Sequence, residues 1–361
     1  MSAGGVREHS RVLLDRGSCH LRRDSADCGR CGWAAQEAGL RTGIFSVSYA
    51  GLWGQASLDP EGFVNKAAEL GFSGVLLMAK APHLSPMTAD DRVVDRLRAL
   101  LDRRGIECIG LAAYTDFLLP APAEVPVSEM QVLYVEACAR IASRIGGKIV
   151  RVFTGYDHGG LPPAEQEARV VRAIRECADR AASHGITLAV QNHHDFAVDT
   201  RAMLALLESV DRPNVMAGYD AWSPGLRGED LESGARLMAP RTALTIAADY
   251  LRFPRYRYEP GLVNYTREEP DGVRATTMGE GCIDYPAFFR GLRAGGYDGW
   301  VVYEMCSPVT GGGAIENLDR KARAFLGHIE RTWTEKCPPW RRSSASSSSR
   351  SMRSSPWPST R

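Results

Sequence analysis

Eight short apolar runs, rich in valine, isoleucine and other strand-forming residues, alternate with amphipathic stretches of helical length along most of this chain. Strands joined through helices pair in parallel, because the helix carries the chain back to the starting edge of the sheet. The alternation therefore predicts a parallel α/β fold. The predicted strands cover residues 43–50, 74–80, 106–114, 148–155, 186–194, 214–222, 243–251 and 299–305.

The stretches between these runs carry helix start and stop signals. Asp59 and Pro60 open one helix as its cap and first turn, and Gly71 closes it. Residues 162–185 begin with prolines and acids and end at a glycine in the same way. Eight βα units over residues 43–334 fit one (β/α)8 TIM barrel, whose usual size is roughly 250 residues. A doubly wound open sheet is the alternative, but the first strand is not followed by a glycine-rich phosphate turn.

Two terminal segments lack this pattern. Residues 1–42 have little apolar periodicity and predict a weakly ordered leader, while residues 335–361 form a Ser/Arg/Pro-rich tail that we expect to be disordered. The leader includes a CGRC pair with zinc-knuckle spacing, although a flexible extension explains it more simply. The four nearest candidate zinc ligands are Cys19, His20, Cys28 and Cys31.

Composition narrows the functional classes. Hydrophobic residues make up 44%, charged residues 24%, and the formal net charge is +1, without the basic excess of a nucleic-acid binder. No run approaches the roughly 20 apolar residues of a membrane span, and no secretory signal opens the chain, so we expect a cytoplasmic protein. Nine cysteines, an odd number, do not suggest a disulfide framework. Those within the apolar patterns are expected to be small buried hydrophobes.

Polar side chains gather at the carboxyl ends of the predicted strands, where TIM barrels carry their chemistry. Strand alternation predicts that Gln191 and His193 share one face, opposite His194. Asp220 and Glu304 end buried strands, where a carboxylate needs a cation or several donors; a divalent metal or an arginine would serve. The full set is Lys80, Tyr114, Asp116, Arg151 (within its strand), Tyr156, Asp157, His158, Gln191, His193, His194, Asp220, Asp249 and Glu304.

Three of these segments carry a resemblance to a known family. The segment MGEGCIDYPAFFRGLRAGGYDGWVVYEM (278–305) resembles the closing unit of the xylose isomerase-like TIM-barrel superfamily of sugar isomerases, epimerases and inosose dehydratases. GYDAWSP (218–224) resembles its sixth strand and LAVQNHHD (188–195) its fifth. The resemblance spans about residues 43–332.

The resemblance implies a divalent metal held by four strand-end ligands, manganese being expected and magnesium, cobalt or zinc being alternatives. Asp220 and Glu304 match two ligands directly. Gln191 stands where a glutamate is expected; its amide oxygen can ligate a hard cation but brings no charge. Ile246 stands where a histidine is expected and cannot ligate. The predicted metal ligands are therefore Asp220, Glu304 and Gln191.

The same resemblance implies that two carboxylates, on opposite faces of the substrate, remove and return a proton at the carbon beside a carbonyl. A glutamine such as Gln191 cannot act as either carboxylate. A one-base reaction remains open. His193 or His158 would be the base, since a histidine has a reference pKa near 6.5, and Lys80 would polarise a carbonyl or stabilise an oxyanion. The predicted catalytic residues are Glu304, His193, Lys80 and His158, and the predicted substrate contacts are Arg151, Tyr114, Arg255 and Trp222.

Residues 249–281 form a connection too long for a simple βα loop, which predicts a lid or a partner surface. Three arginines alternate there with aromatic residues, a pattern suited to a sugar ring, a phosphate or a subunit interface. They are Arg252, Arg255 and Arg257 with Phe253, Tyr256 and Tyr258.

The leading hypothesis from the sequence is a metal-assisted isomerase or epimerase acting on a sugar or sugar phosphate through an enediolate. A lyase of the same superfamily, such as a keto-sugar or inosose dehydratase or a glycoside β-eliminase, is the first alternative. A non-catalytic sugar-binding or partner-dependent barrel is the second. The expected partners are a small carbohydrate and a second subunit, of the same or another chain, rather than nucleic acid or membrane.

Overall fold

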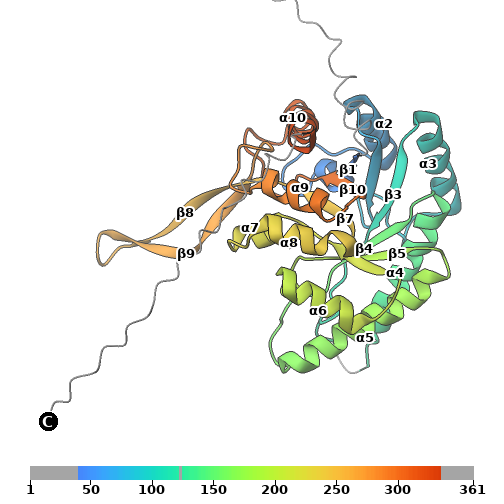
Figure 1. Cartoon of the computed structure of the whole chain (residues 1–361), viewed down its shortest axis with the longest axis horizontal. Helices are drawn as coiled ribbons and strands as arrows, with labels where there is room; N and C mark the ends of the chain where they lie inside the picture. The colour runs from blue at the N-terminus through green and yellow to red at the C-terminus, as the bar shows by residue number, and fades with distance from the viewer. Residues whose placement is uncertain (1–39, 122–123, 335–361) are drawn as a thin grey trace, which may run out of the picture.

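The computed structural model describes residues 40–121 and 124–334, and it shows a closed parallel barrel surrounded by helices (Figure 1). Neighbouring strands follow the order β1-β10-β7-β6-β5-β4-β3-β2, and β1 pairs with β2 to close the ring. The predicted TIM barrel is therefore confirmed, and the open doubly wound sheet is excluded. The barrel strands are β1 (Arg41–Phe45), β2 (Gly74–Met78), β3 (Glu107–Ala112), β4 (Ile149–Val152), β5 (Thr187–Gln191), β6 (Val215–Gly218), β7 (Thr242–Ala247) and β10 (Trp300–Tyr303).

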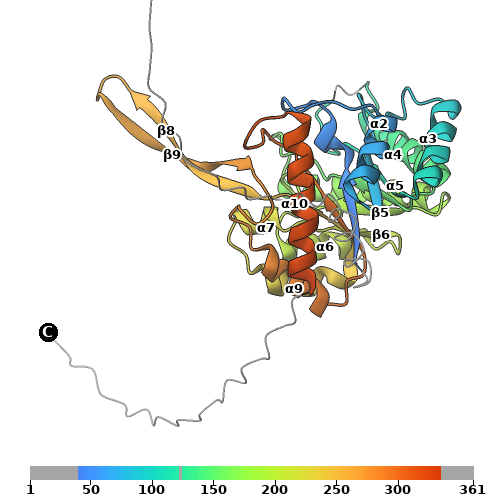
Figure 2. The same ribbon diagram turned by 90° about the horizontal axis from the view of Figure 1, so that it is seen from above.

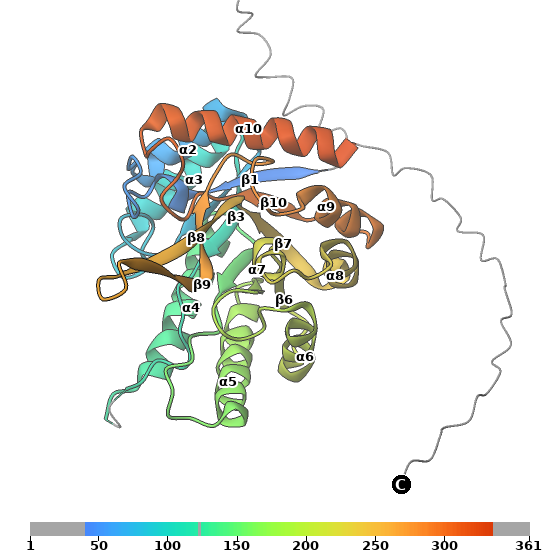
Figure 3. The ribbon, with the colours of Figure 1, turned by 90° about the vertical axis from the view of Figure 1, so that its left-hand side faces the viewer.

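Helices cover the outside of the barrel (Figure 3). The first follows its local signals: the Asp59 carboxylate accepts a hydrogen bond from Gly62 N, and Gly71 ends the helix with a φ of 92°. The helices are α2 (Pro60–Leu70), α3 (Asp91–Arg104), α4 (Val127–Arg144), α5 (Pro163–Ala182), α6 (Thr200–Val210), α7 (Trp222–Leu226), α8 (Leu231–Met238), α9 (Tyr285–Ala294) and α10 (Ile315–Thr334), with short 3-10 turns η1 (Ser46–Tyr49) and η2 (Ala239–Arg241).

Apolar side chains form two layers, one between strands and helices and one inside the barrel. The inner layer includes Leu76, Ile109, Ile246 and Trp300, so the barrel interior is packed rather than open. This packing confines polar side chains to the carboxyl end of the strands. It also explains why position 246 is apolar, since its side chain is fully buried in the inner layer.

All eight barrel strands end earlier than the predicted runs, and three of the differences have a visible cause. The second half of 43–50 forms η1, where the Ser46 hydroxyl accepts a hydrogen bond from Met78 N of the next strand. The run 243–251 divides into β7 and the start of a separate strand. The run 186–194 ends at Gln191, because His194 takes a φ of 68° in the left-handed region. The predicted alternation therefore does not continue through the two histidines.

The long insertion is an antiparallel hairpin of β8 (Tyr250–Glu259) and β9 (Asn264–Ala275) that extends away from the barrel (Figures 1 and 2). Most of its side chains are exposed. Arg255 and Arg257 pair with Glu268 within the ribbon, whereas Arg252 donates to the carbonyl oxygen of Leu226 at the end of α7.

The predictions for residues 1–39, which include the zinc-knuckle pair, and for the tail at 335–361 lie outside the described residues. Arg41 and Thr42 belong to β1, so the barrel begins slightly before the predicted boundary at 43. Among the described helices, none combines the length and the apolar character that crossing a membrane requires. Of the five cysteines in the apolar patterns, Cys108, Cys138 and Cys177 are buried as expected, whereas Cys282 is exposed and Cys306 is half-buried.

Candidate active site

A cavity of about 570 Å³ opens at the carboxyl end of the barrel strands. Its wall follows the barrel order: cationic side chains come from β2 and β4, imidazoles follow β5, and a carboxyl group follows β10. Because each group sits at the end of a different strand, distant sequence positions converge there. Its polar lining includes Lys80, Tyr114, Thr115, Asp116, Arg151, Tyr156, Gln191, His193, His194, Glu304 and Cys306.

Arg151 is the most deeply buried cation of this wall, with an exposed fraction of 1%. Its guanidinium carbon lies 3.9 Å from the ring centroid of Phe153 and 5.0 Å from that of Tyr114. Nη1 donates to the carbonyl oxygen of Ala113 at 2.9 Å, but the buried Nε has no partner among the described residues. Aromatic rings, rather than a carboxylate, therefore surround this charge.

Lys80 lies on the same side of the cavity. Its Nζ is 3.9 Å from the ring centroid of Tyr114, so this ring contacts both cations. Burial, and then the nearby Arg151 charge, lower the pKa of the Lys80 ammonium. The two cations therefore form a positive surface across the ends of β2, β3 and β4.

His193 and His194 follow β5, and both line the cavity. Burial, with the neighbouring imidazole and Arg151, lowers the pKa of His193 to about 3. Burial and Arg151 lower the pKa of His194 to about 4. Both rings are therefore neutral near pH 7.

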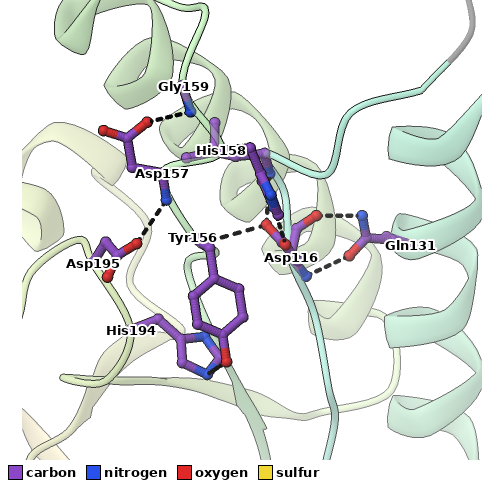
Figure 4. A network of polar contacts seen from close by, with 9 residues as sticks. Asp116, Gln131, Tyr156, Asp157, His158, Gly159, His194 and Asp195 are labelled. Carbon is purple, nitrogen blue, oxygen red and sulfur yellow. Dashed lines mark hydrogen bonds and ion pairs between the residues drawn. The ribbon is translucent and has the colours of Figure 1, made fainter. Parts of the chain in front are cut away.

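A polar network fixes the outer rim of the site (Figure 4). The hydroxyl group of Tyr156 lies 2.8 Å from Nε2 of His194, and the two rings stack with centroids 4.0 Å apart. Nearby, Nε2 of His158 lies 2.7 Å from a carboxylate oxygen of Asp116. Gln131 both donates to and accepts from the Asp116 backbone, which holds this loop in place.

Asp220 lies fully buried behind Gln191 rather than in the cavity wall. One of its oxygens accepts from Ile246 N at 2.8 Å, and the other accepts from the Trp222 indole at 3.2 Å and from the Gln191 amide. Burial raises the pKa of Asp220 to about 8 despite these donors. The oxygen Oε1 of Gln191 has no partner among the described residues.

Glu304 reaches the cavity from the end of β10 and is 8% exposed. Burial raises the pKa of its carboxyl group, while the Cys306 thiol and Arg151 oppose the shift. Cys306 lies 2.9 Å from the hydroxyl group of Tyr250, which anchors this side of the cavity to the hairpin base. Glu304 and the β5 histidines lie on separate sides of the opening, because β6 and β7 stand between their strands.

Asp249, another strand-end carboxylate, is committed to the backbone. Its Oδ2 accepts from both Gly279 N and Gly281 N at 2.9 Å. A Cβ atom on Gly281 would lie 1.9 Å from a carboxylate oxygen of Asp249. The glycine–acid–glycine stretch therefore wraps around Asp249, which has a structural part rather than a place in the cavity.

The structure brings six predicted site residues into the cavity wall: Lys80, Tyr114, Arg151, Gln191, His193 and Glu304. It places four elsewhere. Asp220 lies behind the wall, Trp222 packs against His193 with ring centroids 4.7 Å apart, and His158 stands at the rim on Asp116. Arg255 lies on the projecting hairpin, paired with Glu268. The assigned roles of all ten remain predictions.

The predicted metal site is the weakest part of this arrangement. The two Asp220 oxygens accept three N–H groups, Gln191 turns its amide nitrogen toward them, and Ile246 offers a backbone N–H and an apolar side chain. Divalent ions require oxygen or nitrogen lone pairs that are free to ligate. Within residues 40–121 and 124–334, no group of three or more His, Cys, Asp or Glu is placed to hold a metal ion. This donor set does not fit a divalent metal.

Sequence reasoning missed some of the wall and assigned no role to His194, Tyr156 and Asp116, which it had placed at strand ends. Trp53 reaches the cavity from the loop after η1, and Cys306 follows Glu304 by two residues. Cys306 could have been found from its position just beyond a strand end. Trp53 had no such signal, because its approach depends on how a loop folds.

Comparison with known proteins now assigns the fold to a family. A profile of the xylose isomerase-like TIM barrel family matches residues 64–329, which is most of the barrel. The chain belongs to that family. The xylose isomerase-like assignment made from the three sequence motifs is confirmed.

A ketose 3-epimerase of Arthrobacter globiformis is 27% identical over 271 residues, covering 71% of this chain and 82% of the relative. D-psicose 3-epimerase of Clostridium cellulolyticum H10, solved with D-tagatose, superposes with a TM-score of 0.64 at 16% identity, covering 81% of this chain and 99% of that one. A probable 3-DHS dehydratase of Bacillus anthracis gives 0.60 at 16% identity, covering 80% and 98%. At these identities the solved structures establish the shared fold.

Proposed function

We propose that this protein is a sugar isomerase or epimerase that moves a proton on the carbon beside a carbonyl group, through an enediolate. One observation supports the proposal most directly: neutral imidazoles and a carboxyl group of raised pKa line the same cavity from separate strand ends. The ammonium group of Lys80 lies between them around the barrel. The similarity to a ketose 3-epimerase supports the same class of reaction.

Each role follows from the environment of the residue. His193 is neutral near pH 7 and accepts the proton from the substrate carbon. Glu304, whose carboxyl pKa is raised by burial, delivers a proton from another side of the opening. The Lys80 ammonium stabilises the negative charge that develops on the carbonyl oxygen, in a cavity where desolvation strengthens that interaction. Tyr114 and Arg151 contact the substrate.

A lyase is the second candidate, and Gln191 is the observation that favours it. An amide at the end of β5 removes one of the two carboxylates of a symmetrical epimerisation, whereas elimination needs one base and a departing group. In that reaction His193 removes the proton, and the electron pair forms a double bond as the β-substituent leaves. Released water or a broken glycosidic link distinguishes this outcome from an isomer of the substrate.

The test is proton exchange in D2O. Ketohexoses and their phosphates are incubated with the chelator-treated protein, and NMR follows deuterium incorporation beside the carbonyl carbon. We expect exchange with the wild type, a loss of roughly 100-fold or more in His193→Gln, and full retention in His184→Gln, in the turn after α5. Exchange that requires an added divalent ion would contradict the metal-free assignment. Neither exchange nor elimination with any compound would support a binding role and overturn the proposal.

A further inference from the structure

The proposed reaction gives Arg151 a contact with the substrate but no partner of opposite charge. Lys80 stabilises the developing oxyanion, but the buried guanidinium of Arg151 has no assigned counter-charge. In the described part of the chain, no carboxylate forms an ion pair with Arg151 or Lys80, and the Arg151 Nε has no hydrogen-bond partner. Moving a charge out of water without an opposite charge beside it raises the free energy of the folded protein. The presence of a buried arginine here therefore calls for an explanation.

The surrounding acids do not provide one. The Asp116 carboxylate is bound by His158 and by the backbone N–H groups of Leu118 and Tyr156. The Arg151 charge opposes the rise in the Glu304 pKa, but among the described residues Glu304 forms no ion pair with Arg151.

The contacts of Arg151 fix its position without neutralising it. Phe153, Tyr114 and Phe45 surround the guanidinium, with centroids 3.9, 5.0 and 5.5 Å from its central carbon. Rings hold the cation in one place, and its Nε–H has no partner among the described residues. A preorganised planar donor of this kind suits a charged oxygen group better than a neutral hydroxyl group.

We propose that Arg151, with Lys80 beside it, forms a subsite for an acid group on the substrate, so that the enzyme acts on an anionic sugar rather than a neutral ketose. The inference rests on the proposed function, because it names a property of that site's substrate. A neutral ketose would leave two neighbouring cations uncompensated in the bound state. A carboxylate or phosphate ester neutralises one of them before the reaction begins, while Lys80 serves the oxyanion.

The test measures binding, so it is independent of turnover. Titration calorimetry at fixed ionic strength compares D-glucose with D-glucuronate, which differ by one acid group, and with D-glucose 6-phosphate. We expect at least one acidic sugar to bind wild type roughly tenfold or more tightly than D-glucose. Arg151→Met, which keeps an apolar stem against Phe153, should remove this preference. Arg96→Met, on the outer face of α3, should retain it.

The outcomes separate the possibilities. Tighter binding of the uronate identifies a carboxylate as the acid group, and tighter binding of the phosphate identifies a phosphate ester. Lys80→Met, which should weaken the preference, provides a second variant if Arg151→Met does not fold. Absent or equal binding of all three sugars, or a preference that survives in both variants, overturns the subsite. Failure of deuterium exchange together with a retained acid preference would overturn only the proposed reaction.

Discussion

The side-chain amide of Gln191 donates a hydrogen bond to the carboxylate of Asp220 on the neighbouring strand. A carboxylate at position 191 would repel Asp220 or share a metal ion with it, whereas the Gln191 amide is a neutral hydrogen-bond donor. Asp220 lies behind the cavity wall. The amide is thus well suited to a buried carboxyl group whose pKa is raised to about 8. It is poorly suited to a divalent ion.

Placing a carboxylate at position 191 should change both the stability of the protein and its response to a divalent ion. In Gln191→Glu, two acids meet without the N–H donor, and we expect a loss of roughly 1–3 kcal/mol in chelator. Manganese chloride should raise the melting temperature of this variant and leave the wild type unchanged. Gln191→Met, which lacks both donor and charge, is the control and should not respond to manganese. Near-stoichiometric metal in wild type purified without chelator, found by elemental mass spectrometry, would contradict the donor-set argument.

His193 should make stability depend on pH on the acid side. Its pKa falls from 6.5 to about 3 on folding, so below about pH 6.5 the unfolded chain binds a proton that the folded protein does not. Stability is therefore expected to fall by roughly 1–2 kcal/mol as the pH drops from about 6.5 to 5. Urea unfolding should show a shallower decrease in His193→Gln. If the unfolding free energy of His193→Gln fell with pH as steeply as that of His184→Gln, burial of His193 would not be the cause.

Asp220 should make the stability of the protein decrease as the pH rises, the opposite of the effect of His193. Its pKa rises from 3.8 to about 8 on folding, so between these values the folded protein holds a proton that the unfolded chain releases. Stability from this group is lost as the pH rises toward 8, by on the order of 1 kcal/mol or more. Asn cannot ionise, so Asp220→Asn should gain stability relative to wild type between about pH 5 and 8. Asp102→Asn, on the exposed end of α3, should show no such relative gain.

Local signals in the sequence were enough for the architecture. Asp59 and Gly71 bound their helix through contacts within a few residues, and eight apolar runs specify eight strands whatever their exact ends. The strand-end rule likewise located Lys80, Arg151 and Glu304 in one cavity. These features depend on short-range chemistry or on topology common to the fold.

Contacts between distant segments decided the rest. The left-handed turn at His194 interrupts the strand alternation and brings both histidines to the cavity, which no period-two pattern predicts. Arg255 has the composition of a ligand contact, but hairpin pairing carries it away from the barrel. Asp220 was recognisable as a strand-end acid, whereas its burial behind Gln191 depends on the pairing of β5 with β6.

The Asp249 turn offers a test of the motif that first indicated the family. A Cβ atom on Gly281 would lie 1.9 Å from Asp249 Oδ1 and 2.7 Å from Tyr250 N, so the loop must move to admit any side chain. Its movement would break the hydrogen bonds of Gly279 N and Gly281 N to the Asp249 carboxylate. We expect Gly281→Ala to lower the unfolding free energy by roughly 2–3 kcal/mol. Gly261→Ala in the hairpin turn, where a Cβ meets open space, is the matched control, and equal stability of the two variants would show that Asp249 does not hold this loop.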